Sequence, residues 1–116
     1  FNYFQKQGKG SFASITSVAG MMGSRHAPAY NASKAYQINY LIGLRQKIKR
    51  LRLPVSFTDL RTGFVDTPMA KAEGKFWVAT PEKAARQIQT AINRKATVAY
   101  ITKRWRIVGF FLKLFA

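Results

Sequence analysis

The sequence contains no cysteine and a single histidine among its 116 residues. Without cysteine, disulfide bonds, thiol catalysis and cysteine-ligated zinc are excluded, and the chain fits a reducing compartment such as the cytoplasm. Because a metal centre or a serine–histidine pair needs further partners, His26 is interpreted as a solvent-facing loop residue. We therefore predict a cytoplasmic protein without a metal site.

Glycine-rich phosphate-binding loops are also absent. Neither a G-x-G-x-x-G nor a G-x-x-x-G-x-G pattern occurs, and Gly8 and Gly10 precede a predicted strand instead of following one. A nucleotide pyrophosphate is usually bound where such a turn opens a helix after a strand. This stretch of chain is therefore not expected to bind a dinucleotide tightly by itself.

Acidic residues are few, with 4 Asp and Glu against 20 Lys and Arg and a formal net charge of +16. This balance favours polyanions or anionic membranes as partners, unless another part of a longer protein carries the compensating acids. The densest basic run, residues 45–52, lies at the end of a predicted helix, where the helix dipole favours cations. It has no interleaved aromatic residues, so nucleic-acid binding is not predicted.

The hydrophobic content of 47% suits one small domain with a core. Short apolar segments with β-branched residues predict strands over residues 10–16, 55–60 and 97–101. Apolar residues at three- and four-residue spacing predict helices over residues 30–51 and from 81 to about 95. The alternation of strands and helices predicts the α/β class with parallel strand pairing.

A phenol and an ammonium lie one helical turn apart at the start of the longest predicted helix. Tyr30 and Lys34 share one face of that helix. An ordinary phenol, with a pKa near 10, is a poor acid or base at neutral pH, and a nearby cation favours loss of its proton. Tyr30 could then transfer a proton, whereas the alternative is a half-buried tyrosine beside a solvated lysine. Ser17, 13 residues upstream at a predicted strand end, is positioned to approach Tyr30.

Three motifs occur in one order along the chain: Ser17, the Tyr30-x-x-x-Lys34 pair, and the segment Thr62-Gly63-Phe64-Val65-Asp66-Thr67. In order and spacing they resemble the short-chain dehydrogenase/reductase family, and the resemblance extends from about residue 10 to residue 101. It implies the C-terminal half of a Rossmann-like doubly wound parallel sheet. Residues 1–102 would be this half of a dinucleotide-binding catalytic domain, and residues 103–116 a basic-aromatic amphipathic tail. Thr62 stands where the family usually has proline.

The same resemblance implies an NAD(P)-dependent oxidoreductase that interconverts a carbonyl and an alcohol. Tyr30 would be the general acid and base, Lys34 would assist it and bind the nicotinamide ribose, and Ser17 would hold the substrate oxygen. The cofactor, NAD or NADP, would be bound by Tyr30, Lys34, Gly63, Val65 and Thr67. The small-molecule substrate would be lined by Ser17, Met21, Met22, Met69 and Phe76. For the two loop methionines, 21 and 22, packing on the core is the alternative.

The predicted helix over residues 30–51 has more apolar residues than one buried face needs. Those outside the core set are Tyr36, Tyr40, Ile42 and Leu44. In the resembling family the second face of this helix packs in a two-fold symmetric four-helix interface. We therefore predict a homodimer or tetramer assembled through this helix.

The tail over residues 103–116 joins a basic start to an aromatic, apolar run. The run is shorter than the roughly 20 residues that a bilayer-spanning helix needs, but it could lie in the membrane interface. A closing helix that covers another part of the protein or a partner subunit is the alternative. Peripheral membrane contact keeps a second function open, a catalytically inactive interaction or membrane-surface module built on a truncated oxidoreductase core.

Overall fold

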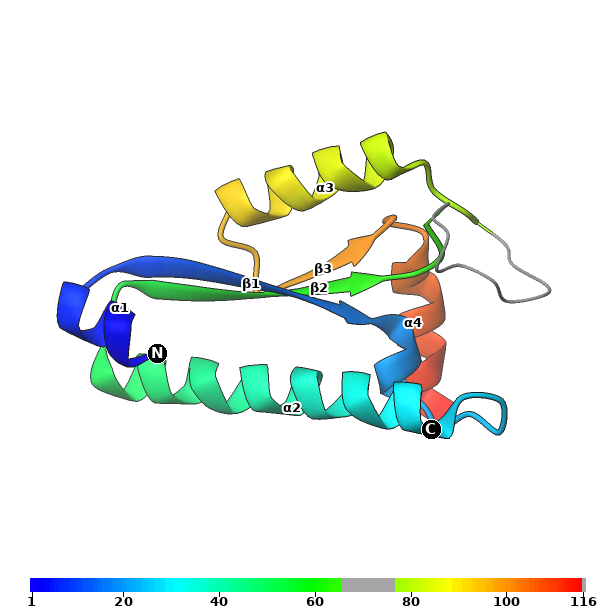
Figure 1. The fold of residues 1–116 in the computed structure, drawn as a ribbon, viewed down its shortest axis with the longest axis horizontal. Helices are drawn as coiled ribbons and strands as arrows, with labels where there is room; N and C mark the ends of the chain where they lie inside the picture. The colour runs from blue at the N-terminus through cyan, green and yellow to red at the C-terminus, as the bar shows by residue number, and fades with distance from the viewer. Residues whose placement is uncertain (66–76, 116) are drawn as a thin grey trace.

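The structure is a computed structural model that describes residues 1–65 and 77–115 (Figure 1). The elements in chain order are α1 (Asn2–Gln7), β1 (Gly10–Ser17), the 3₁₀ helix η1 (Val18–Met21), α2 (Pro28–Leu51), β2 (Val55–Thr62), α3 (Pro81–Asn93), β3 (Val98–Ile101) and α4 (Trp105–Phe115). The predicted α/β class is confirmed, because strands and helices alternate along most of the chain.

The three strands form one parallel sheet in the order β1-β2-β3. β1 pairs with β2 over its full length, from Gly10 opposite Val55 to Ser17 opposite Thr62. β3 pairs only with the second half of β2, from Asp59 to Thr62. β2 continues two residues past its predicted end, because the polar residues that close it still pair with both neighbouring strands.

Helices cover both faces of this sheet (Figure 1). α2 runs along one face, with α1 near its C-terminal end, and α3 lies on the other face. The core between α2 and the sheet centres on Leu41, Val55 and Phe57, all buried. Each such side chain contributes about 1.5–3 kcal/mol when it leaves water. α2 is therefore held on the sheet along its length, which positions its first turns beside the end of β1.

The helix ends follow their sequence signals. Gly8, with φ 78, caps α1 in the left-handed conformation and donates its N–H to the Phe4 carbonyl at 2.9 Å. The Thr80 hydroxyl accepts the Lys83 N–H at 3.2 Å and begins α3. Glycine at the end of a helix and threonine before a proline at its start are the usual residues at such ends. The turn η1 was not predicted, because a 3₁₀ turn of four residues leaves no periodic pattern in the sequence.

The prediction for the second face of α2 is wrong at one residue. Leu44 packs on the core cluster of Leu41, Val55 and Phe57. Tyr36 and Tyr40, in contrast, are exposed at 69% and 56%, and their rings stack with centroids 5.9 Å apart. The outer face of α2 thus includes Tyr36, Tyr40 and Ile42, which is also exposed, but does not include Leu44.

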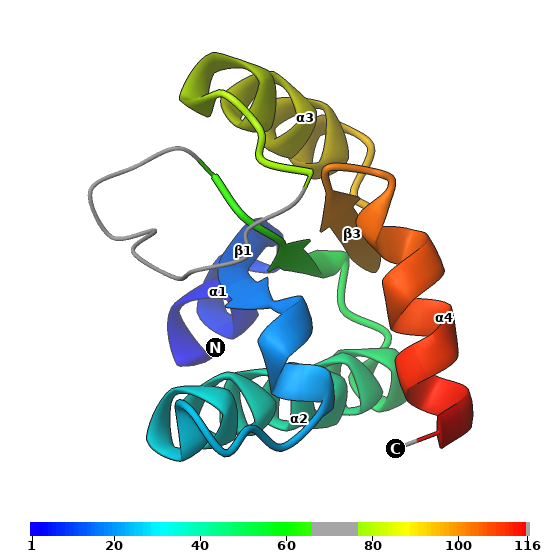
Figure 2. The ribbon, with the colours of Figure 1, turned by 90° about the vertical axis from the view of Figure 1, so that its right-hand side faces the viewer.

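The tail forms α4, which packs against η1 and β3 (Figure 2). Trp105 is buried at its start, and Gly109 faces the Tyr100 ring so closely that a side-chain carbon there would meet it. One face of α4 is therefore part of the folded body. Within the described ranges, no helix combines the length and apolar character needed to cross a membrane.

Candidate active site

Most of the predicted site residues that the structure describes lie at one end of the sheet. Ser17 is the last residue of β1, and Thr62 the last of β2. Tyr30 and Lys34 lie in the first two turns of α2. In parallel sheets, ligands bind outside the carboxyl ends of the strands. Three further predicted residues, Thr67, Met69 and Phe76, lie outside the described residues.

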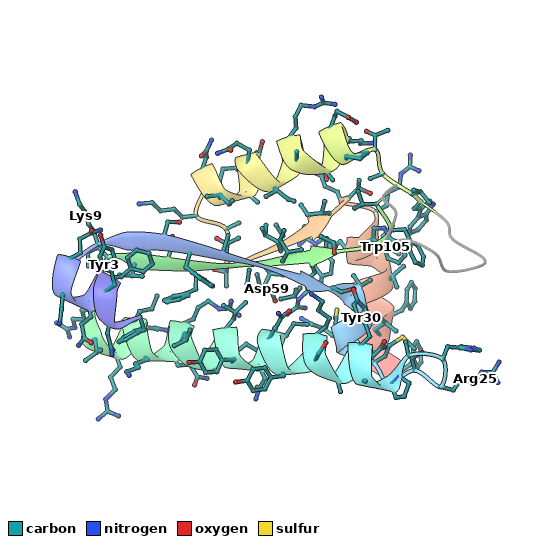
Figure 3. All side chains as sticks on the ribbon, in the orientation of Figure 1. Tyr3, Lys9, Arg25, Tyr30, Asp59 and Trp105 are labelled. Atoms are coloured by element: carbon teal, nitrogen blue, oxygen red, sulfur yellow. The ribbon has the colours of Figure 1, made fainter. Side chains whose placement is uncertain are left out.

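Lys34 contacts both the tyrosine and the sheet. Its Nζ atom lies 5.8 Å from the centroid of the Tyr30 ring, as the predicted helical spacing requires. The same Nζ donates a hydrogen bond to the Ile15 carbonyl at 3.1 Å. An ammonium has three N–H donors, so two remain for a ligand. Tyr30 itself is 48% exposed, and its ring is accessible from solvent (Figure 3).

Ser17 is buried and its hydroxyl makes two contacts. The oxygen accepts the Ala19 N–H at 3.1 Å, which caps η1. Its O–H donates to the Thr62 carbonyl at 3.3 Å, which is long for a hydroxyl donor. The backbone contact therefore fixes the position of the oxygen, while the proton is only weakly held.

Two residues that sequence reasoning missed set the position of η1 against α2. Asn31 is buried, and its Nδ2 donates to the Met22 carbonyl at 2.9 Å. Gly20 lies against the backbone of Lys34 and Ala35, where a side-chain carbon would come within 2.8 Å of backbone atoms. The close approach of Gly20 explains how the strand end and the helix start meet. The only sequence signal was an isolated glycine in an apolar loop.

Met21 and Met22 line a hollow of about 370 Å³ beside the start of α2. The α2 residues in this hollow are Pro28, Asn31, Ala32 and Ala35. At about 100° per residue, Ala32 lies on the far side of the helix from Tyr30, whereas Asn31 lies only about 60° around the helix from Lys34. The structure thus brings the two methionines together at one hollow beside the start of α2.

The segment after β2 is tied to its neighbours. The Thr62 hydroxyl donates to the Thr16 carbonyl at 3.0 Å, a bond that a proline here would lack. The Gly63 N–H donates to the Ile101 carbonyl at 2.8 Å, and the Trp105 indole lies where a side chain on Gly63 would be. Val65 forms a parallel bridge with Ala79. Gly63 is therefore needed for the packing of α4, whatever else it binds.

A buried charge pair lies between the sheet and α2, and sequence reasoning did not find it. The Asp59 carboxylate is fully buried. It accepts hydrogen bonds from Arg61 Nε at 2.8 Å and from the Thr16 hydroxyl at 2.5 Å. Arg61 Nη1 also donates to the Tyr100 hydroxyl at 3.1 Å and lies 3.6 Å from the Met21 sulfur. The sequence did carry a signal for this pair. Residues 59 and 61 follow Val55 and Phe57 at every second position of β2, so all four side chains face the same side of the sheet.

Arg45 of α2 lies near this pair, with Nη1 3.4 Å from the Thr97 carbonyl. Burial lowers the pKa of Arg45 below its ordinary value, the Asp59 charge opposes this, and the Arg61 charge adds to it. The Asp59 carboxylate is thus paired with Arg61 and also acts on Arg45 through its charge. In the parts of the chain that the structure describes, no three His, Cys, Asp or Glu side chains gather as a metal site would require.

Comparison with known proteins bears on this arrangement. The family model described as short chain dehydrogenase matches residues 1–76, which include Ser17, Tyr30 and Lys34. The comparison with curated proteins gives no match. Among solved structures, a point variant of actinorhodin polyketide ketoreductase with NADPH is similar at a TM-score of 0.55 and 23% identity. The similarity covers 94% of this chain and 42% of that chain.

The structural similarity shows that the three-stranded sheet and its helices are part of a Rossmann-like fold, and that the chain spans less than half of the ketoreductase. The family match covers well over half of the sequence and contains the strand end and the helix start described above. The protein therefore belongs to the short chain dehydrogenase family.

Proposed function

We propose that the protein is an NAD(P)-dependent oxidoreductase that interconverts a carbonyl and an alcohol. The observation that carries the proposal is the position of Lys34, whose ammonium is bonded to the Ile15 carbonyl and faces the Tyr30 ring. Ser17 ends the same strand two residues later. Membership of the short chain dehydrogenase family supports the reaction class, and the similarity to a ketoreductase with NADPH supports the cofactor class.

Tyr30 is proposed to move the proton. In reduction its hydroxyl would give a proton to the carbonyl oxygen of the substrate, and in oxidation its phenolate would accept one from the alcohol. The Lys34 ammonium lies beside the Tyr30 ring, with Nζ 5.8 Å from its centroid. A positioned acid or base of this kind typically accelerates a reaction by about 10²–10⁴-fold.

Ser17 is proposed to hold the substrate oxygen. Its O–H would turn from the Thr62 carbonyl, where the 3.3 Å hydrogen bond is weak, towards the substrate. The Ala19 N–H would keep the oxygen in place during this rotation. The reorientation costs little, because one modest hydrogen bond is exchanged for another.

The donor groups fit a nicotinamide cofactor, which when bound would supply or accept the hydride. Lys34 has two N–H donors left for ribose hydroxyls, and Tyr30 is open to solvent beside it. Of the other predicted cofactor residues, Gly63 has its N–H engaged by Ile101, so it would contribute its carbonyl oxygen. Val65 would contribute its backbone and Thr67 its hydroxyl.

Residues 1–102 are proposed to be the C-terminal half of a catalytic domain, followed by the tail over 103–116. β1, a strand of eight residues, is paired on one side only within the described residues. Phe12 and Ile15 on this strand are 45% and 56% exposed. An edge strand of this length with exposed apolar side chains is usually covered. Further strands of a larger sheet would pair with it.

The test uses the full-length protein with any upstream segment of its gene. Carbonyl reduction would be followed with NADH and NADPH over a panel of ketones and aldehydes. We expect Tyr30→Phe to lower kcat by about 10²–10⁴-fold with little change in cofactor affinity. Tyr36→Phe, at an exposed tyrosine of the same helix, is the matched control and should retain activity. A Tyr30→Phe enzyme within a few-fold of wild type would refute the assignment.

A second candidate is the catalytically inactive interaction or membrane-surface module. The exposed apolar side of α4 and the net charge of +16 favour it. The same assay separates the two functions. A wild-type protein that binds neither cofactor and reduces no carbonyl compound would support the module and exclude the enzyme.

A further inference from the structure

Helix α4 is apolar on two opposite sides. One side, with Trp105 and Gly109, packs into the fold. The other side is the α4 apolar face, defined here as Ile107, Phe110, Phe111, Leu114 and Phe115, and each of these side chains is more than half exposed. Their three- and four-residue spacing places them along one stripe. An amphipathic helix of a self-contained domain would have polar residues there.

Aromatic contacts make this face continuous. The rings of Phe110 and Phe111 lie 5.7 Å apart, and those of Phe111 and Phe115 stack at 6.4 Å. Single exposed apolar residues are normal on a protein surface, but a contiguous aromatic patch marks an interaction site. The α4 apolar face therefore needs an apolar partner.

A basic cleft adjoins this face. A cavity of about 980 Å³ lies between α3 and α4 along β3, which the two helices flank in Figure 2. We call it the basic cleft after its exposed cations, Arg86, Arg94, Lys103, Arg106 and Lys113. None of its lining residues is acidic, and none of these five cations forms an ion pair with another described residue.

The cleft and the face are parts of one surface. Phe110 belongs to the α4 apolar face and also lines the basic cleft. Arg106 and Lys113 flank the apolar stripe on the side towards α3. The partner must therefore be apolar where it meets α4 and negatively charged beside it.

We propose that this surface docks the protein onto an anionic phospholipid membrane. The α4 apolar face would enter the boundary between headgroups and acyl chains, and the basic cleft would bind lipid phosphates. With 11 residues, α4 is too short to span a bilayer and would lie in the interface. A second copy is disfavoured, because it would bring another net charge of +16 against the same basic cleft. Nucleic acid would leave the apolar face uncovered.

The test measures partition of the full-length protein onto lipid vesicles by sedimentation. One set contains phosphatidylcholine alone, and the other contains phosphatidylcholine mixed with phosphatidylglycerol. We expect binding to the second set, weakened by added salt. Arg106→Gln/Lys113→Gln should lower partition by at least about tenfold, since each cation near an anionic surface contributes about fivefold. Phe110→Ser/Leu114→Ser should lower it at least as much.

The control variants remove equal charge or equal apolar surface elsewhere. Lys49→Gln/Arg50→Gln changes two exposed cations at the C-terminal end of α2, at the opposite end of the molecule from α4 (Figure 1). Tyr36→Ser/Tyr40→Ser removes exposed rings from α2. Both should bind vesicles much as wild type does. Thermal unfolding of every variant separates lost binding from lost fold, and a test pair that unfolds is replaced by Ile107→Ser/Phe111→Ser.

Four results would overturn the proposal. The first is an equal loss of binding in the control variants, and the second is equal binding to both vesicle sets. The third is that the protein binds a random DNA duplex more tightly than anionic vesicles and that Phe110→Ser/Leu114→Ser leaves this binding unchanged. That result would assign the basic cleft to nucleic acid. The fourth is that the protein forms a dimer in the absence of vesicles and that the same substitution dissociates it. That result would assign the α4 apolar face to a second copy of the chain.

Discussion

The Nζ atom of Lys34 donates a hydrogen bond to the carbonyl oxygen of Ile15 at 3.1 Å. This bond joins the second turn of α2 to the last residues of β1. It places a positive charge beside Tyr30 and within two residues of Ser17. This contact from helix to strand thus helps to fix the relative position of the three proposed site residues.

Replacement of Lys34 tests whether its charge has a catalytic role. We expect Lys34→Met to lower kcat/KM for carbonyl reduction by at least about 10²-fold, because it removes the cation beside the proposed acid and a proposed cofactor donor together. Stability should fall by only about 0.5–1.5 kcal/mol, the usual net contribution of one hydrogen bond. Lys49→Met, at an exposed cation of the same helix, is the control. A large loss of stability with unchanged kinetics would show a structural role.

Gly63 tests the packing of α4 on the sheet. Gly63→Ala should destabilise the protein by about 1–3 kcal/mol, because its new methyl group would overlap the Trp105 indole. Gly43→Ala is the matched control, since nothing lies near that position in α2. Alanine there should stabilise the helix by about 0.5–1 kcal/mol. Urea unfolding of both variants measures the contrast, and equal effects would contradict the packing seen at Trp105.

The buried pair of Asp59 and Arg61 should behave as a unit. Asp59→Leu and Arg61→Met are each expected to cost about 3–5 kcal/mol, because each leaves one charge buried without its partner. The double variant should cost less than the sum, since no unpaired charge remains. Urea unfolding in a double-mutant cycle measures the coupling. Additive effects would mean that water or Arg45 compensates the remaining charge.

Assembly through α2 remains a prediction. The stacked pair of Tyr36 and Tyr40 forms its exposed face. If the full-length protein is a homodimer or tetramer through this helix, Tyr40→Glu should shift it towards monomer by burying a charge in an apolar interface. Sedimentation equilibrium measures the shift, and Gln89→Glu at an exposed site on α3 is the control. A wild type that is monomeric at micromolar concentration would exclude this interface.

The sequence predicted the parts of the fold that depend on local patterns. The strands, the long helix and the caps at Gly8 and Thr80 all have signals within a few residues of chain. Tyr30 and Lys34 meet because helical spacing alone brings positions i and i+4 together. The order of Ser17, this pair and the segment after β2 was sufficient to identify the family that the comparison then confirmed.

Other features depend on contacts between residues far apart in the chain. In the sequence, Gly20 and Gly63 look like ordinary loop glycines. Only the folded chain shows that α2 lies against Gly20 and that Trp105 packs on Gly63. Leu44 and Tyr40 are both apolar positions in one helix, and only the sheet below α2 decides which is buried.

By itself, the sequence determined the α/β class, the caps at Gly8 and Thr80 and the spacing of Ser17, Tyr30 and Lys34. The tertiary structure decided that Asp59 and Arg61 form a buried pair, that the loop methionines line a hollow with the first turns of α2, and that α4 keeps one apolar side exposed. The physical reason is that periodicity and capping act over a few residues. Burial, charge pairing and surface exposure depend instead on which distant segments fill the same space.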